Sequence, residues 1–227
     1  TTMKIHYFGH SAFALEGSEN ILIDPFISGN PHMQGRSLPQ GMKFSHIFLT
    51  HGHGDHTGDV ETLAKFHQAT VVANFELASL MAGRGLKVES CSLGGLLHFP
   101  WGWVRQVPAT HSSSFEGQYA GAPVGLIINI GGVTVYHAGD TGLFGDMELI
   151  GQRYQPQVAL LPIGSTFTMD CEEALEAVKK LRPQIAIPMH YNTFPVIKAD
   201  PQAFKARVEA ETPTKVQVLK ACEVFEV

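Results

Sequence analysis

The segment most able to do chemistry is a histidine-rich stretch, residues 50–58, which directly follows a short apolar run. It holds four potential metal ligands: His51, His53, Asp55 and His56. In an extended loop, residues two apart point the same way, so His51 and His53 can bind one ion together. Asp55 and His56 stand where the loop must turn into the next helix, so they can face a second ion. Imidazole and carboxylate together suit zinc, manganese, iron or nickel.

Three more candidate ligands stand apart along the chain, each directly after an apolar run that predicts a strand. They are His111, Asp140 and His190. Taken singly, His111 is more simply interpreted as a surface histidine and Asp140 as a turn aspartate. His190 is more simply interpreted as a hydrogen-bonded core histidine. Two metal ions, however, need more donors than the first segment offers. One added histidine would complete the ligands of each ion, and one aspartate between the ions would bridge them. The three further residues therefore match the ligands that two ions still lack.

Size and composition predict one domain over residues 1–227. The chain is 44% apolar and 16% charged, which is the balance of a globular protein with a sizeable core. A net charge of −5, without runs of Lys or Arg, gives no basic face for nucleic acid. The first residues contain no long apolar stretch, so we expect neither an export signal nor a membrane anchor. Three scattered cysteines indicate free thiols in a reducing compartment, which predicts a cytoplasmic protein.

The positions of apolar runs and turn residues predict a β-meander followed by a β–α unit in each half of the chain. Expected strands cover residues 4–8, 12–16, 21–24, 47–49, 70–73, 87–91, 96–99, 103–108, 124–129, 134–137, 158–162, 185–188 and 215–219. Expected helices cover residues 60–67, with Asp59 as N-cap, and 76–81, 172–181 and 201–211. Residues 112–123 are predicted to form a loop. This pattern favours two sheets face to face, with helices on both outer surfaces.

The order of candidate ligands resembles a known family. The motif His51-x-His53-x-Asp55-His56, followed by His111, Asp140 and His190, is similar to the metal-binding set of the metallo-β-lactamase superfamily. Five further phrases resemble its small metal-dependent hydrolases: residues 9–13 (GHSAF), 24–31 (DPFISGNP), 110–114 (THSSS), 137–141 (HAGDT) and 189–195 (MHYNTFP). The resemblance extends from about Ile5 to the end of the chain. It implies an α/β (α+β) fold, the four-layer αββα sandwich, with a dinuclear site at one edge of the sheets.

The resemblance also implies how the ligands are shared between two divalent ions. It assigns His51, His53 and His111 to one ion. It assigns Asp55, His56 and His190 to the other, with Asp140 bridging. Zinc is the first expectation, with manganese, iron and nickel as alternatives. The chain departs from the family at Ser165, where the resemblance implies glycine or an acidic residue.

Two divalent ions that share a water molecule make hydroxide available near neutral pH. The predicted nucleophile is therefore a bridging hydroxide, oriented by Asp55. The loop that holds His10 lies near the active-site rim in the family, so His10 could contact substrate or protonate a leaving group, with a purely structural role as the alternative. Asp24 is a candidate to hold one of the metal-binding imidazoles in place, with a plain role in the turn as the alternative. His137 is expected to serve packing.

The same resemblance narrows the function. The short interval between Asp140 and His190 leaves no room for the inserted domain of RNA-processing relatives, and the short stretch after His190 disfavours a thioester hydrolase of the glyoxalase type. An intact His53 disfavours the oxygen-reducing relatives, which carry glutamate there. The sequence thus predicts a hydrolase of a small-molecule phosphodiester, lactone or other ester. A non-catalytic metal-binding or ligand-sensing module remains the alternative, and a homo-oligomer remains open.

Overall fold

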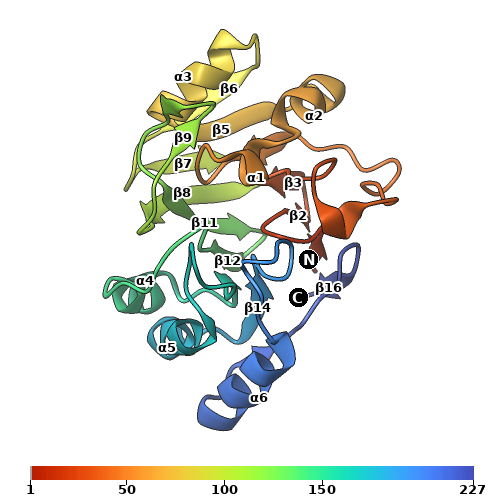
Figure 1. The fold of residues 1–227 in the computed structure, drawn as a ribbon. Coiled ribbons are helices and arrows are strands. Elements are labelled where there is room, and N and C mark those ends of the chain that lie inside the picture. The colour runs from red at the N-terminus through yellow and green to blue at the C-terminus, as the bar shows by residue number, and fades with distance from the viewer. Residues whose placement is uncertain (1) are drawn as a thin grey trace.

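The structure is a computed structural model that describes residues 2–227, and two seven-stranded sheets dominate it (Figure 1). The first sheet has the order β16-β1-β2-β3-β4-β5-β6. Its strands are β1 (Lys4–Tyr7), β2 (Phe13–Glu16), β3 (Asn20–Ile23), β4 (His46–Phe48), β5 (Thr70–Asn74), β6 (Val88–Cys91) and β16 (Val224–Glu226). The antiparallel meander of β1, β2 and β3 continues into parallel pairing from β3 through β6.

The second sheet has the order β15-β14-β13-β12-β11-β8-β7. Its strands are β7 (Leu96–Phe99), β8 (Gly102–Pro108), β11 (Val124–Ile130), β12 (Val133–His137), β13 (Val158–Pro162), β14 (Ile185–Met189) and β15 (Lys215–Val216). Strands β7, β8, β11 and β12 pair antiparallel, and β12 through β15 pair parallel. Each sheet therefore changes from antiparallel to parallel along its width.

Alternation along each strand divides the apolar side chains between two cores. In β3, Ile21 and Ile23 belong to the hydrophobic cluster shared by both sheets, whereas Leu22, between them, belongs to the cluster beneath the helices. This period of two is what a strand imposes on its side chains. The inner faces of the two sheets therefore pack on each other, and their outer faces are covered by helices.

Helices cover both outer surfaces, as predicted. Helices α2 (Val60–His67) and α3 (Phe75–Gly83) pack on the first sheet, and α4 (Met147–Tyr154), α5 (Cys171–Leu181) and α6 (Pro201–Glu211) lie at the second (Figure 1). Side chains of Asp170 and Asp200 cap α5 and α6 by accepting backbone N–H bonds. Within residues 2–227, no helix has the length and apolar character needed to cross a membrane.

Several local predictions were wrong or incomplete. Asp59 precedes α2 but makes no capping bond, because its Oδ2 atom accepts N–H bonds from Ile27 and Ser28 instead. The expected loop at residues 112–123 contains a small hairpin, β9 (Ser114–Phe115) with β10 (Gln118–Tyr119). The last predicted strand, 215–219, ends at Val216. The prediction lacked β16, α4, α1 (Gly54–Thr57) and the short 3-10 helix η1 (Pro31–Met33).

Candidate metal centre

The histidine-rich segment leaves β4 as an extended loop and then turns into α1. His53 is the N-cap residue of α1, so Asp55 and His56 lie on its single turn. Gly52 permits a close approach to the second half of the chain, because a Cβ atom there would lie 2.7 Å from the carbonyl oxygen of Ser114. The loop is thus pressed against the segment that carries His111. Local sequence and packing together set the spacing of the first four candidate ligands.

Three imidazoles form the first group of candidate ligands. His51 is fully buried, and its Nε2 atom lies 3.1 Å from Nδ1 of His53. His111 joins them from the loop after β8, and one nitrogen of each ring lies within 4.8 Å of the others. Three imidazoles at this separation are a donor set typical of zinc.

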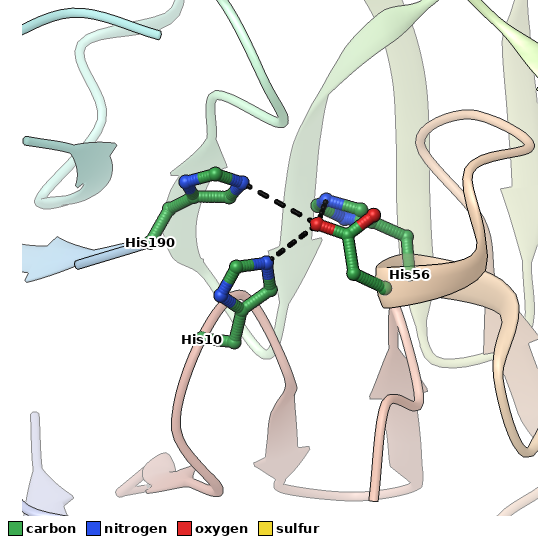
Figure 2. A group of neighbouring side chains, drawn as sticks. His10, His56 and His190 are labelled. Atoms are coloured by element: carbon green, nitrogen blue, oxygen red, sulfur yellow. Dashed lines mark hydrogen bonds and ion pairs between the residues drawn. The ribbon is translucent and has the colours of Figure 1, made fainter. Parts of the chain in front are cut away.

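A second group surrounds one oxygen of Asp55. Its Oδ2 atom lies 2.7 Å from Nε2 of His10, and 3.6 Å from Nε2 of both His56 and His190. Figure 2 shows the three rings converging on this carboxylate from separate parts of the chain. His190 follows β14 in the second sheet, whereas His10 lies in the turn between β1 and β2. This site therefore forms only when both sheets are in place.

Asp140 lies between the two groups. Its Oδ1 atom is 3.2 Å from Nε2 of His56. Its Oδ2 atom is 3.0 Å from Nε2 of His190 and 3.5 Å from Nε2 of His111. The same oxygen is 3.7 Å from Nε2 of His51, and the side chain is only 3% exposed. One buried carboxylate therefore faces both groups.

Unpaired buried atoms test whether these residues fit metal ions. Nε2 of His56, Nε2 of His190 and Oδ1 of Asp140 are buried and make no hydrogen bond of acceptable geometry. Leaving such polar atoms unpaired in the interior costs free energy, so buried polar groups nearly always have a partner. All three atoms have lone pairs that a cation can accept, and they lie together. The donor set therefore fits divalent metal ions.

The electrostatics of the same residues reflect tight packing of opposite charges. Burial raises the pKa of Asp140, but the charges of His56 and His190 outweigh it and hold the pKa well below its usual range. Burial lowers the pKa of His190, but Asp140 and Asp55 outweigh it and raise this pKa to about 9. Burial, with the charge of His56, holds the pKa of His51 well below normal. Without metal, the second group therefore keeps a proton on His190, whereas His51 of the first group stays neutral.

Asp24 holds His56 in position, as the sequence suggested. Its Oδ2 atom accepts a 2.7 Å hydrogen bond from Nδ1 of His56, and both carboxylate oxygens accept bonds from Thr50, at 2.9 Å from N–H and 2.6 Å from the hydroxyl. These bonds satisfy a carboxylate that has no exposed surface. Because Nδ1 of His56 donates, its Nε2 lone pair is directed at the candidate site.

His10 is held by contacts on every side and has no exposed surface. Its backbone adopts φ = 55°, and its carbonyl oxygen accepts bonds from Tyr7 Oη and from the N–H of His190. Nδ1 of His10 lies 2.8 Å from Oγ1 of Thr193. Sequence reasoning gave Thr193 no role, because nothing local connects residues 183 positions apart. The ring does not line the cavity above the candidate ligands.

Two other polar residues near the site, His137 and Asn192, lie outside the ligand groups. His137 is buried, donates from Nε2 to the carbonyl of Ser11 and accepts at Nδ1 from the N–H of Gly139, which agrees with a packing role. Asn192 bonds twice to Ala199 and stabilises its own loop. The structure thus brings together all seven predicted ligands and keeps these neighbours apart from them.

Comparisons with known proteins identify relatives that are named as metal-dependent hydrolases. A profile described as the beta-lactamase superfamily domain matches residues 19–191. A UPF0173 metal-dependent hydrolase of Pelotomaculum thermopropionicum is 46% identical over 229 residues, covering 99% of this chain and 100% of the relative. The solved structure of Igni18, a metallo hydrolase from Ignicoccus hospitalis, is 40% identical with a TM-score of 0.92, covering 100% of this chain and 99% of that chain. The metallo-beta-lactamase fold protein YhfI from Bacillus subtilis, 13% identical over the full length of both chains, has a TM-score of 0.76 and shares the fold.

Proposed function

The chain belongs to the metallo-β-lactamase superfamily and to its metal-dependent hydrolases, and from this premise we propose that it uses two divalent ions to hydrolyse a small-molecule phosphodiester, lactone or other ester. The observation that carries the proposal is Asp140, a buried carboxylate that faces two separate groups of ligand atoms. A structural ion needs one closed set of ligands, whereas a carboxylate shared by two sets beside a cavity is typical of dinuclear hydrolases.

The proposed ligand assignment follows the two groups. His51, His53 and His111 would hold the first ion. Asp55, His56 and His190 would hold the second, and Asp140 would bridge. Zinc fits the three-imidazole set, and manganese, iron or nickel fit the mixed set equally by donor type. When bound, two such ions lower the pKa of a shared water and polarise the scissile carbonyl or phosphoryl group.

Asp55 is the residue proposed to handle the proton. All of its close contacts with His10, His56 and His190 involve Oδ2. The side chain is 29% exposed and lines the cavity, so Oδ1 is free to face the attacking water. We propose that Oδ1 accepts a hydrogen bond from that water, orients it, and then passes the proton to the departing oxygen.

His10 is proposed to act through Asp55 instead of touching substrate. Burial lowers the pKa of His10 to about 4, despite its bond to Asp55, so the ring is neutral at pH 7. A neutral ring has one N–H group. If Nε2 donates it to Asp55, Nδ1 accepts the hydroxyl hydrogen of Thr193. Its full burial leaves His10 without a route to a leaving group, so the better supported role is to fix the Asp55 carboxylate.

Loss of the ligands tests the proposal directly. We expect His53→Ala and Asp140→Ala to lose bound metal and at least about 100-fold in kcat/KM together, because each removes a donor that the other ligands do not replace. Elemental analysis and a panel of phosphodiesters and lactones measure both quantities. His98→Ala and Asp146→Ala, at exposed positions outside the site, are the matched controls.

Three results would count against the proposed function. Full activity in either ligand variant would remove the proposed site. Stoichiometry of one ion per chain would remove the dinuclear mechanism. Two bound ions without hydrolysis of any substrate in the panel would instead support the alternative, a metal-binding module that senses a ligand.

A further inference from the structure

The residues that line the cavity above the candidate ligands indicate which kind of substrate fits there. The cavity has a volume of about 380 Å³, and five of the proposed metal ligands form its floor. Its remaining lining residues are Ser112, Phe167, Phe194 and Ile197. Three of these four side chains are apolar, and two are aromatic. A ligand that reaches the floor must pass between these walls.

No described residue that lines this cavity is Lys or Arg. Proteins usually bind phosphate and carboxylate groups through Arg or Lys side chains. Lys198 lines a neighbouring cavity, which shares only Phe194 with this one and also contains Asp200. A substrate with a second anionic group would therefore find no cation beside the metal-binding floor.

Phe167 lines the cavity although the residue is 57% exposed. The two residues before it, Ser165 and Thr166, adopt left-handed backbone with φ of 62° and 64°. The hydroxyl of Thr166 donates to the carbonyl oxygen of Val196, and the N–H of Ser165 donates to the carbonyl of Met169. Strained backbone of this kind persists only where surrounding contacts enforce it. The loop thus presents a large apolar side chain to solvent at the mouth of the site.

Phe194 forms a second aromatic wall and is fixed from behind. Its ring packs edge-on against His10, with ring centroids 5.5 Å apart, and lies 6.3 Å from the ring of Phe26. Phe194 therefore has little freedom to leave the cavity, whereas Phe167 is exposed. A flat apolar group between a fixed and an exposed aromatic ring would bury surface on both sides.

We propose that the substrate is a lactone or carboxyl ester whose scissile group is attached to an uncharged apolar group, preferably aromatic, held between Phe167 and Phe194. This inference rests on the hydrolase function proposed above and selects among its substrates. In the reaction, water's oxygen forms a bond to the acyl carbon while the acyl carbon–oxygen bond breaks. The departing oxygen takes one proton, so an ester gives a carboxylic acid and an alcohol, and a lactone gives a single hydroxy acid.

The test compares three lactones that differ only in one substituent: γ-butyrolactone, γ-phenyl-γ-butyrolactone and γ-carboxy-γ-butyrolactone. We expect kcat/KM of the metal-loaded enzyme to be about tenfold higher for the phenyl compound than for the parent, because part of the ring's apolar surface is buried. The carboxy compound should be poorer than the parent. Phe167→Ala should remove the advantage of the phenyl compound, lowering its kcat/KM about tenfold more than that of the parent lactone.

Phe66→Ala is the matched control, because Phe66 is an exposed aromatic residue of α2 outside this cavity. A second measurement does not depend on turnover. Calorimetry should show the ring-opened acid 4-hydroxy-4-phenylbutanoate binding about tenfold more tightly than 4-hydroxybutanoate, with the difference lost in Phe167→Ala.

The outcomes separate this inference from the proposed function. Activity with the carboxy compound as best substrate, or faster turnover of bis(4-nitrophenyl) phosphate than of the phenyl lactone, would overturn the inference and leave a hydrolase. Equal losses on all three lactones in Phe167→Ala would also overturn it. If no compound is hydrolysed, the proposed function fails, and the calorimetric preference for the phenyl acid then decides the inference alone.

Discussion

At the scale of single residues, the site depends on which oxygen of Asp55 faces the candidate ligand nitrogens. The bond from His10 holds Oδ2 beside His56 and His190, which leaves Oδ1 for solvent. The Asp55 carboxylate can only accept, so Nε2 of His10 carries the hydrogen, and Thr193 stabilises this tautomer when its hydroxyl donates to Nδ1. A neutral imidazole alone does not favour one tautomer strongly enough to guarantee this arrangement.

Replacement of Thr193 tests this chain of contacts. Thr193→Val keeps the shape but removes the hydroxyl, so His10 can turn or change tautomer and release Asp55. We expect a loss of roughly 10-fold in kcat and in affinity for the second ion. This is the usual effect of replacing a residue that holds a metal ligand in place without binding the metal itself. Chelator competition and steady-state kinetics measure the two. Thr193→Ser should restore both, and equal activity in Val and Ser variants would show that the hydroxyl has no such role.

At the scale of elements, the site depends on how closely the loop after β13 approaches the end of β14. A Cβ atom at Gly164 would lie 2.1 Å from the carbonyl oxygen of His190 and 3.0 Å from Cβ of Ile197. Because the first contact is with backbone, the loop or His190 must move. Any side chain at position 164 therefore displaces a candidate ligand.

Gly164→Ala should accordingly destabilise the fold by about 2–4 kcal/mol and weaken metal binding, since an overlap with backbone cannot be relieved by a rotamer change. Urea unfolding and metal titration measure the two effects. Gly83→Ala is the matched control: no heavy atom lies within 4 Å of its added Cβ, and the position is the last residue of α3. Similar behaviour of the two variants would contradict the packing argument.

The same elements show how far sequence could predict this structure. Apolar runs placed most strands, and the helix at residues 60–67 was predicted with its observed bounds. The pairing of β16 with β1 was not predicted, because residues 224–226 pair only with a strand from the opposite end of the chain. Helix α4 was missed because its exposed residues, including Leu149, blur the apolar pattern. The hydrophobic pattern of a segment predicts a helix or strand only when its buried residues recur at regular intervals.

The sequence could predict which residues form the candidate site but not the contacts that hold them in place. The seven candidate ligands were recognisable because four cluster after one apolar run, three each follow an apolar run of their own, and their order resembles that of a family. The contacts of Asp24 with Thr50 and of His10 with Thr193 join distant segments, so only the fold reveals them. Ser165 adopts left-handed backbone, which would suit glycine, one of the two residue types that the resemblance implies there, although the serine is accommodated here.

At the scale of the whole molecule, each proposed ion would join the two halves. His51 and His53 leave β4 of the first sheet, whereas His111 follows β8 of the second. Asp55 likewise lies on the first half, whereas His190 follows β14 of the second. Because the unfolded chain does not present these donors together, free energy of metal binding adds to the free energy of folding. The ions should therefore act as clamps between the sheets.

Metal removal should lower the melting temperature, and more so at higher pH. At a free zinc concentration 100 times the dissociation constant, one ion stabilises the fold by about 2.7 kcal/mol, which is roughly 5–10 °C here. The pKa of metal-free His190 is about 9, so the ion must displace a proton at pH 6 and at pH 8. Raising pH through this range favours displacement of the proton, which adds about 2.7 kcal/mol per proton to the metal-dependent stabilisation between pH 6 and 8.

Thermal unfolding with zinc or chelator at both pH values measures the difference. Asp140→Ala should abolish most of it, and a zinc-dependent shift that is equal at both pH values would refute proton displacement.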